Sequence, residues 1–266
     1  MVYVRSVKFN ITVSLVVCPI DDYTAEPRSG GNIHVFLKDN PKKPVRKSDG
    51  YYVFTDLTET SYDVLVESDI YLAENVNIVL KELDPANPIA YLNLKPNSVY
   101  PFPLGATLVR VTLRDQNGNA LQNAKAVAAI MSSSCAVAKL AQDGLKKGSS
   151  EIGLINVSGK ISVGDMFLIK EKEEVCSEYC KIVGVSRGKQ LYNLARPLQF
   201  NHIRGALLLP AIETRNASNG EVVIYFRNTR AKHFNAKIEF IHDEKSIVKE
   251  LELTEGKTNY LGVIQV

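Results

Sequence analysis

The sequence predicts an all-β protein of two antiparallel β-sandwiches, the second interrupted by a small β-rich module. Three observations support this fold class. Apolar and polar residues alternate with the period of two that is typical of half-buried strands. Short strand-like runs are separated by turn residues, and one such pattern occurs twice along the 266 residues. This length exceeds one ordinary sandwich of about 100 residues, so we expect two or three compact units.

The first unit is predicted over residues 1–87. Its opening strand, Val7–Val17, alternates apolar with polar residues. The turn Ser48-Asp49-Gly50 leads into an aromatic and β-branched strand, Tyr51–Phe54. Further alternating strands are predicted at 33–37, 62–66 and 76–80. Several short strands without a helical period indicate an antiparallel sandwich.

Residues 88–103 are predicted to form a proline-rich connector. Five of the eleven prolines lie between residues 82 and 103. Because proline cannot donate to a strand ladder, we expect an extended segment there. Tyr100 and Phe102 interleave with its last prolines, so the connector is expected to pack on a domain surface.

The second unit is predicted over residues 104–131 and 211–266. It opens with an alternating strand, but the counterpart of the Ser48-Asp49-Gly50 turn comes only at Ser218-Asn219-Gly220. We therefore expect residues 132–210 to be an inserted β module, placed at a loop tip where insertion costs little.

Within the insert, alternating runs predict several further strands, and the alanine-rich stretch Ser134–Leu145 predicts its one short helix.

The repeated pattern resembles a known domain family. The run Lys43–Leu57, followed by Tyr62-Asp63-Val64, resembles the signature of carboxypeptidase regulatory-like and Cna-B-type domains, and Val111–Val127 is similar to the opening of such a domain. These domains are transthyretin-like β-sandwiches, so the resemblance implies two of them in tandem. It implies little about function, because the family serves as spacers, adhesin stalks, carbohydrate-binding appendages and assembly parts.

A second resemblance concerns the insert. Ile155–Ala206 resembles a short β module of phage and bacterial particle proteins. The linker Leu94–Pro103 is similar to a sequence segment found in proteins of contractile injection systems and phage tails. The residues that carry the first of these are Val163-Gly164-Asp165, Pro197-Leu198, His202 and Gly205-Ala206. Together they imply an accessory part of such a particle.

Composition excludes several partners. Lys and Arg total 32 against 29 for Asp and Glu, a net charge of +3 that is scattered along the chain, so nucleic acid is not expected. No run approaches the roughly 18 apolar residues of a membrane helix, and the alternation after Val7 differs from a signal peptide. We expect no membrane insertion and synthesis in the cytoplasm without a signal peptide; a particle released by lysis would need none.

No catalytic constellation or cofactor motif is found, so we expect a protein that is not an enzyme, with no catalytic, cofactor-binding or metal residues. Its four histidines fall in different predicted domains. Cys176 and Cys180 could form a disulfide, or bind zinc with His202 and a further ligand, but reduced thiols are favoured. Lys8 lies on the polar face of its strand, which disfavours the isopeptide cross-link known in Cna-B-type domains.

Aromatic residues supply the candidate contacts with a ligand or partner: Tyr51, Tyr52, Tyr71, Tyr100 and Phe102. Core packing is the competing interpretation for most tyrosines of the first unit. The favoured function is a structural or adaptor component of a larger protein assembly, such as a phage-tail-like or contractile injection particle, with other protein subunits as partners. The alternative is a carbohydrate-binding or cell-surface recognition module with a glycan partner.

Overall fold

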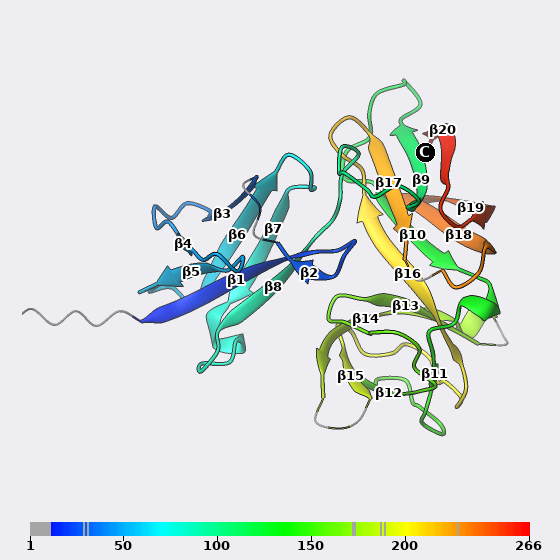
Figure 1. Ribbon diagram of the computed structural model, residues 1–266, viewed down its shortest axis with the longest axis horizontal. Helices are drawn as coiled ribbons and strands as arrows, with labels where there is room; N and C mark the ends of the chain where they lie inside the picture. Colours follow the sequence, from blue (N-terminus) through cyan, green and yellow to red (C-terminus); the bar gives the residue numbers. More distant parts are fainter. Residues whose placement is uncertain are drawn as a thin grey trace, which may run out of the picture. The chain divides into compact units, whose positions relative to one another are not determined.

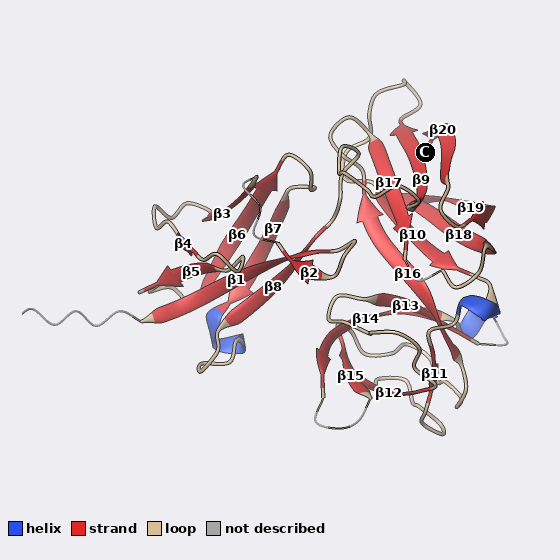
Figure 2. Ribbon diagram, in the orientation of Figure 1, coloured by secondary structure: helices blue, strands red, loops and turns tan. Residues whose placement is uncertain are grey.

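The computed structural model describes residues 12–28, 30, 32–171, 174–186, 188, 190–227 and 229–266. Strands make up most of it, and the helical segments among these residues are three 3-10 turns, η1 (Leu80–Glu82), η2 (Ser133–Cys135) and η3 (Glu174–Cys176) (Figure 2). The predicted all-β fold class is thus confirmed. The expected strand residues 7–11, with Lys8, lie outside the described residues. Two compact units divide the chain, Met1–Pro96 and Asn97–Val266.

The first unit is a sandwich of two sheets (Figure 1). One sheet has the order β2-β1-β5-β4, with β8 on the other side of β1; the second has the order β3-β6-β7. Alternation builds both, because every second residue is buried between the sheets, in β1, β5 and β8 of one sheet and in β3 and β6 of the other. The strands are β1 (Val13–Asp21), β2 (Glu26–Pro27), β3 (Ile33–Leu37), β4 (Val45–Arg46), β5 (Tyr52–Thr55), β6 (Ser61–Ser68), β7 (Glu74–Val79) and β8 (Ile89–Leu94).

The structure corrects the expected connector at 88–103. Its first half is β8, which pairs in parallel with β1 over six residues, from Val16 with Ile89 to Asp21 with Leu94. The prolines misled the prediction because they flank this run and do not interrupt it: Pro88 precedes the strand and Pro96 follows it. The boundary between the units lies between Pro96 and Asn97, nine residues beyond the predicted end of the first sandwich at residue 87.

The second unit contains a sandwich with the same strand connections. Its first strand, β9, pairs antiparallel with β17 and in parallel with the last strand, β20, as β1 does with β5 and β8. The facing strands have the order β16-β10-β18-β19, of which the last three correspond to β3-β6-β7 in the first unit. The strands are β9 (Thr107–Arg114), β10 (Lys125–Ile130), β16 (Leu207–Arg215), β17 (Glu221–Phe226), β18 (His233–His242), β19 (Lys245–Thr254) and β20 (Thr258–Gln265).

The parallel pairing of first and last strands was not predicted in either unit. Alternation reports which face a residue occupies and carries no information on strand direction.

Between β10 and β17 the chain forms a closed β-barrel. Its six strands pair in the cycle β11-β12-β15-β14-β13-β16 and back to β11. All these pairings are antiparallel, and they close the sheet on itself. Strand β16 belongs to both bodies: Leu207–Ala211 pairs within the barrel, and Ala211–Arg215 pairs with β10 of the sandwich. The remaining strands are β11 (Ala138–Leu140), β12 (Glu151–Ile155), β13 (Met166–Lys170), β14 (Glu178–Val185) and β15 (Leu191–Leu194).

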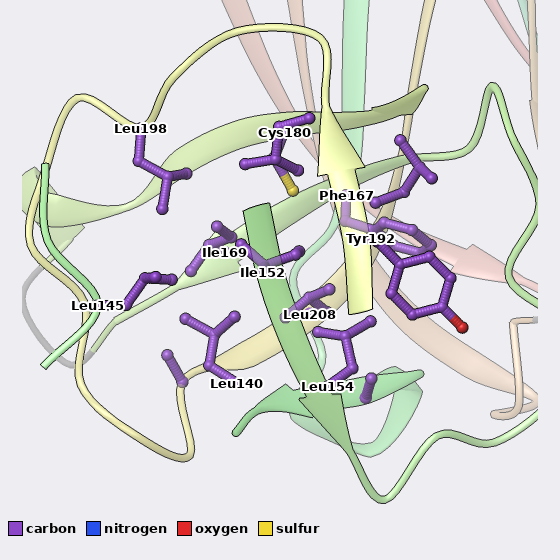
Figure 3. Close-up of a cluster of buried hydrophobic side chains, with 14 of the residues drawn as sticks. Leu140, Leu145, Ile152, Leu154, Phe167, Ile169, Cys180, Tyr192, Leu198 and Leu208 are labelled. Atoms are coloured by element: carbon purple, nitrogen blue, oxygen red, sulfur yellow. The ribbon is translucent and has the colours of Figure 1, made fainter. Parts of the chain in front are cut away.

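The barrel has its own hydrophobic interior (Figure 3). Side chains from all six strands fill it, among them Leu140, Ile152, Phe167, Ile182 and Leu208. The helix expected at Ser134–Leu145 is not formed, because Ala138 and Leu140 point inward and Lys139 outward, which is a strand pattern.

A second, smaller cluster joins the outside of the barrel to the sandwich sheet. Leu168 of β13 packs there with Ala129 of β10 and Leu209 of β16. In the described part of the chain, no helix is long and apolar enough to cross a bilayer.

Candidate functional site: an apolar face on the first unit

One face of the first unit is apolar although it points away from the core. Strand register arranges its side chains in three rows across the sheet β2-β1-β5-β4 and β8. The rows are Val45–Val53–Val16–Ile89, then Tyr51–Cys18–Tyr91, then Pro27–Ile20–Asn93. None of these positions carries a charged side chain. We call these residues the apolar face.

Exposure shows that the described residues leave this face open. Val45 and Tyr91 are 55% and 52% exposed, and Val16, Ile20 and Val53 are half-buried. Strand and residue spacings give the face an area of roughly 300 Å². The outward side of a two-layer sandwich is ordinarily polar, and the largest apolar patch on a soluble monomer is often functional.

The middle row is held together by contacts between its own side chains. Cys18 is fully buried although it lies on the outward face, and its side chain is hydrogen-bonded to Tyr51. Burial raises the pKa of the Cys18 thiol. The pKa of the Tyr51 phenol is raised as well, first by the Cys18 thiol, then by burial and by the nearby Tyr91 phenol. The Tyr51 phenol therefore stays neutral at physiological pH, hydrogen-bonded to the thiol.

The second unit provides an internal comparison. Counting from the turn glycines Gly50 and Gly220, the positions of Tyr51 and Val16 correspond to Glu221 and Arg110. There these two positions are polar, although Val223 and Tyr225 share the outward face with them, and this part of the face is covered. Arg110 donates a hydrogen bond to the carbonyl of Ser98 (2.9 Å), and Glu221 is hydrogen-bonded to the Ser98 side chain.

Aromatic rings extend this cover. Phe102 packs between Tyr100 and Tyr225 in tilted ring contacts, with ring centroids 4.6 and 5.9 Å away. Tyr225 lies on β17, so residues 98–102 pack across the outer surface of the second sandwich. The equivalent surface of the first unit has no such cover among the described residues.

The five aromatic residues that the sequence suggested as contacts with a ligand or partner do not lie together on the apolar face. Tyr52, Tyr71 and Tyr100 are buried, which corrects their assignment as surface contacts. Their hydroxyl groups explain the burial in the first two cases: Tyr52 donates to the Ile33 carbonyl and Tyr71 to the Asp21 carboxylate, both at 2.8 Å.

The other two predicted contact residues are half-buried. Tyr51 lies on the apolar face, whereas Phe102 belongs to the cover of the second unit. The five residues do not form one site. Sequence analysis missed Val16, Val45, Val53, Ile89 and Tyr91, although apolar residues at consecutive strand positions, as in Val16-Val17-Cys18, were a usable signal.

Polar chemistry concentrates at one end of the barrel. Both ring nitrogens of buried His202 face glutamates: Nδ1 lies 3.1 Å from Glu171 Oε1 and Nε2 lies 2.8 Å from Glu178 Oε1. Backbone N–H groups of Gln199, Phe200 and Ile203 also donate to these carboxylates. With every ring nitrogen engaged, the cluster fixes the loops at this end of the barrel.

The two cysteines considered as metal ligands flank Glu178 of that cluster in the sequence. Cys176 and Cys180 are free thiols, and Cys180 points into the barrel interior (Figure 3). Burial raises the pKa of Cys180 to about 12, which disfavours the thiolate that a metal would require. Among the described residues no group of three or more His, Cys, Asp or Glu is arranged to hold a metal ion.

Two pilin proteins are among the solved structures that are similar to this chain. A streptococcal ancillary pilin aligns with 96% of this chain at 11% identity and a TM-score of 0.22, and the chain spans 61% of its length. The major pilin subunit of Bacillus cereus aligns over 96% of this chain and 99% of its own, at 10% identity and a TM-score of 0.25. No family model and no curated protein sequence matches the chain.

Proposed function

We propose that this chain is a non-enzymatic structural or adaptor component of a larger protein assembly, and that a neighbouring subunit packs on the apolar face. The observation that carries the proposal is the contrast between the two sandwiches. Equivalent positions hold Val16 and Tyr51 in the first unit, but Arg110 and Glu221 in the second. A sandwich of this kind does not need the apolar residues for its own fold, so their exposure indicates a surface that is covered on assembly.

The finer prediction is that the assembly is a phage-tail-like or contractile injection particle. It is supported by the sequence resemblance of the insert, whose Val163-Gly164-Asp165 turn and Gly205-Ala206 pair precede β13 and β16 of the barrel. We further propose synthesis in the cytoplasm and release as part of the particle. A glycan partner remains the competing prediction and is distinguished by the experiment below.

Site-specific photo-cross-linking tests the proposal. A photoreactive phenylalanine analogue replaces Tyr91, which is 52% exposed, and the variant is expressed in the native host. We expect an adduct with a defined protein subunit, identified by mass spectrometry. The matched control places the analogue at Tyr260, 76% exposed beside Arg110 on the corresponding sheet of the second unit, and should not give that adduct.

A second variant measures the contribution of the face. Val45→Lys with Tyr91→Lys places two charges on exposed positions without disturbing the core, and should weaken subunit capture at least about tenfold while leaving thermal unfolding unchanged. Unchanged capture by this variant, or a glycan as the bound species, would refute the proposed function.

A further inference from the structure

The second unit shows how the outward side of such a sandwich is covered. Val223 and Tyr225 lie on the outward side of β17, yet they are only 3% and 2% exposed. Residues 98–102 lie over this side of the sheet. Phe102 packs on Tyr225, and the Ser98 carbonyl accepts a hydrogen bond from Arg110. The cover is one short segment that contains proline and aromatic residues, with the sequence Ser-Val-Tyr-Pro-Phe.

The size of the apolar face on the first unit also suits a short segment. The face measures roughly 300 Å², whereas a stable interface between folded subunits takes about 800 Å² from each partner. Five residues in the polyproline II conformation span about 16 Å. The four strands β4, β5, β1 and β8, which lie side by side (Figure 1), span about 14 Å. One segment laid across these strands is therefore long enough to cover the face.

The middle row of the face offers the groups that recognise a polyproline II segment. The pKa of the Tyr51 phenol is raised by the Cys18 thiol, by burial and by the Tyr91 phenol, so these three groups lie close together. Aromatic surfaces bind polyproline II segments, whose carbonyl groups have no internal hydrogen-bond partner. The tyrosine rings give such a segment an apolar contact, and their hydroxyl groups donate to its carbonyls.

The two apolar rows favour proline over other residues. Val16, Val53 and Ile89 offer no side-chain acceptor, and the backbone N–H and C=O groups of a sheet are directed along its plane. A backbone N–H directed at these side chains would be buried without a partner, which is costly. Proline has no N–H, so it packs there without this cost.

The differences between the two units define the charge of the segment. Arg110 and Glu221 hold Ser98 in the second unit, whereas the equivalent Val16 and Tyr51 favour an apolar residue at that point. The charge of Asp49, in the turn before Tyr51, also raises the pKa of the Tyr51 phenol. An acidic residue on the segment would be repelled by Asp49. The segment that fits is therefore apolar and carries no acidic side chain.

We propose that the apolar face binds a short proline-containing segment that a neighbouring subunit presents in the polyproline II conformation. Its prolines pack on Val16, Val53 and Ile89, and the hydroxyl groups of Tyr51 and Tyr91 donate to its carbonyls. The inference rests on the proposed function, because it names the part of the neighbouring subunit that packs on the face.

Titration of the ¹⁵N-labelled full chain with a synthetic peptide tests the inference by NMR. The probe is acetyl-Val-Tyr-Pro-Phe-Pro-amide, which has the sequence of residues 99–103. The chain's own copy of this segment is intramolecular and keeps its place on the second unit. We expect saturable shifts of the amides of β1, β5 and β8. The matched peptide acetyl-Val-Tyr-Ala-Phe-Ala-amide should bind at least about fivefold more weakly.

Protein variants locate the binding. Tyr91→Ala removes a ring and a hydroxyl group from the face and should weaken binding of the proline peptide at least about fivefold. Tyr260→Ala, the control, removes a more exposed tyrosine from β20 and should leave the titration unchanged. Equal binding of the two peptides, or equal effects of the two substitutions, would overturn the inference.

The photo-cross-link at Tyr91 separates this inference from the proposed function. Digestion of the adduct should place the cross-linked residue in a segment of the neighbouring subunit that contains at least one proline and no acidic residue. A cross-linked residue within a strand or helix of that subunit overturns the inference, and the proposed function stands. The absence of any protein adduct, with the peptide still bound at the face, would instead refute the proposed function.

Discussion

His202 is the polar side chain on which the barrel depends most. It is 1% exposed, and its two ring nitrogens lie 3.1 and 2.8 Å from carboxylate oxygens of Glu171 and Glu178. Those carboxylates are themselves nearly buried, at 8% and 10% side-chain exposure. Removing one partner from a buried charged cluster leaves the others without compensation, and this costs more than the loss of the contact itself.

We expect His202→Leu to lower the free energy of unfolding of the barrel by about 3 kcal/mol. Hydrogen exchange measured by mass spectrometry checks this, since the amides of β11 to β15 should lose protection while those of the first unit do not. His233→Leu is the control: His233 is exposed, so its replacement should change stability by less than about 0.5 kcal/mol. Equal effects of the two substitutions would contradict a structural role for the cluster.

At the scale of single residues, the sequence predicted the face that a side chain occupies on its strand better than the partner that the side chain contacts. It singled out His202 as a zinc candidate and as part of the resemblance of the insert. It did not indicate the contacts with Glu171 and Glu178, because the convergence of these three residues depends on barrel closure. It also assigned the buried Tyr71 to the surface, since nothing local shows that its hydroxyl meets Asp21, fifty residues away. A side chain's partner is a long-range property, whereas its face on a strand is a local one.

Among the elements, the turn that opens β17 is sterically constrained by backbone. Gly220 has a φ of +85°, and a Cβ there would lie 2.6 Å from the Leu113 carbonyl oxygen. The backbone is held at this distance because the Leu113 N–H donates to the Gly220 carbonyl (2.8 Å). Gly118, in the turn after β9, has a similar φ of +82° but open space around it.

We therefore predict that Gly220→Ala is more destabilising than Gly118→Ala. The second change should cost about 1 kcal/mol, the cost of a left-handed conformation for a residue with a Cβ. The first should cost at least about 1 kcal/mol more, because the steric overlap is with backbone. Chemical denaturation followed by circular dichroism measures both, and indistinguishable midpoints would show that the turn relaxes without cost.

Alternation was sufficient for most individual strands and insufficient for their closure. It correctly indicated β3, β5, β6 and β7 of the first unit, since one buried face imposes a period of two. It gave no sign that the insert closes into a barrel, because the pairing of β11 with both β12 and β16 joins residues far apart in sequence. It failed at Ser134–Leu145, where the small residues suit a helix and a tight barrel interior equally.

For the whole molecule, the decisive correction concerns where the first unit ends. Strand β8 pairs with β1 along six residues and contributes Ala90, Leu92 and Leu94 to the core, at 9%, 7% and 0% exposure. Proline content placed the boundary at residue 87, before this strand, whereas the packed unit extends to Pro96. Burial, which no local composition reports, decides which residues a domain requires.

A fragment of residues 1–96 should accordingly fold by itself and unfold cooperatively, whereas residues 1–87 should not fold. Loss of β8 would expose the edge of β1 from Val16 to Asp21, including buried Val17, and remove the last strand that a small sandwich of this size needs to bury its core. Amide dispersion in NMR spectra and thermal unfolding followed by circular dichroism distinguish the two fragments. Cooperative folding of residues 1–87 would show that the parallel β1–β8 pair is an addition to the sandwich and no part of its core.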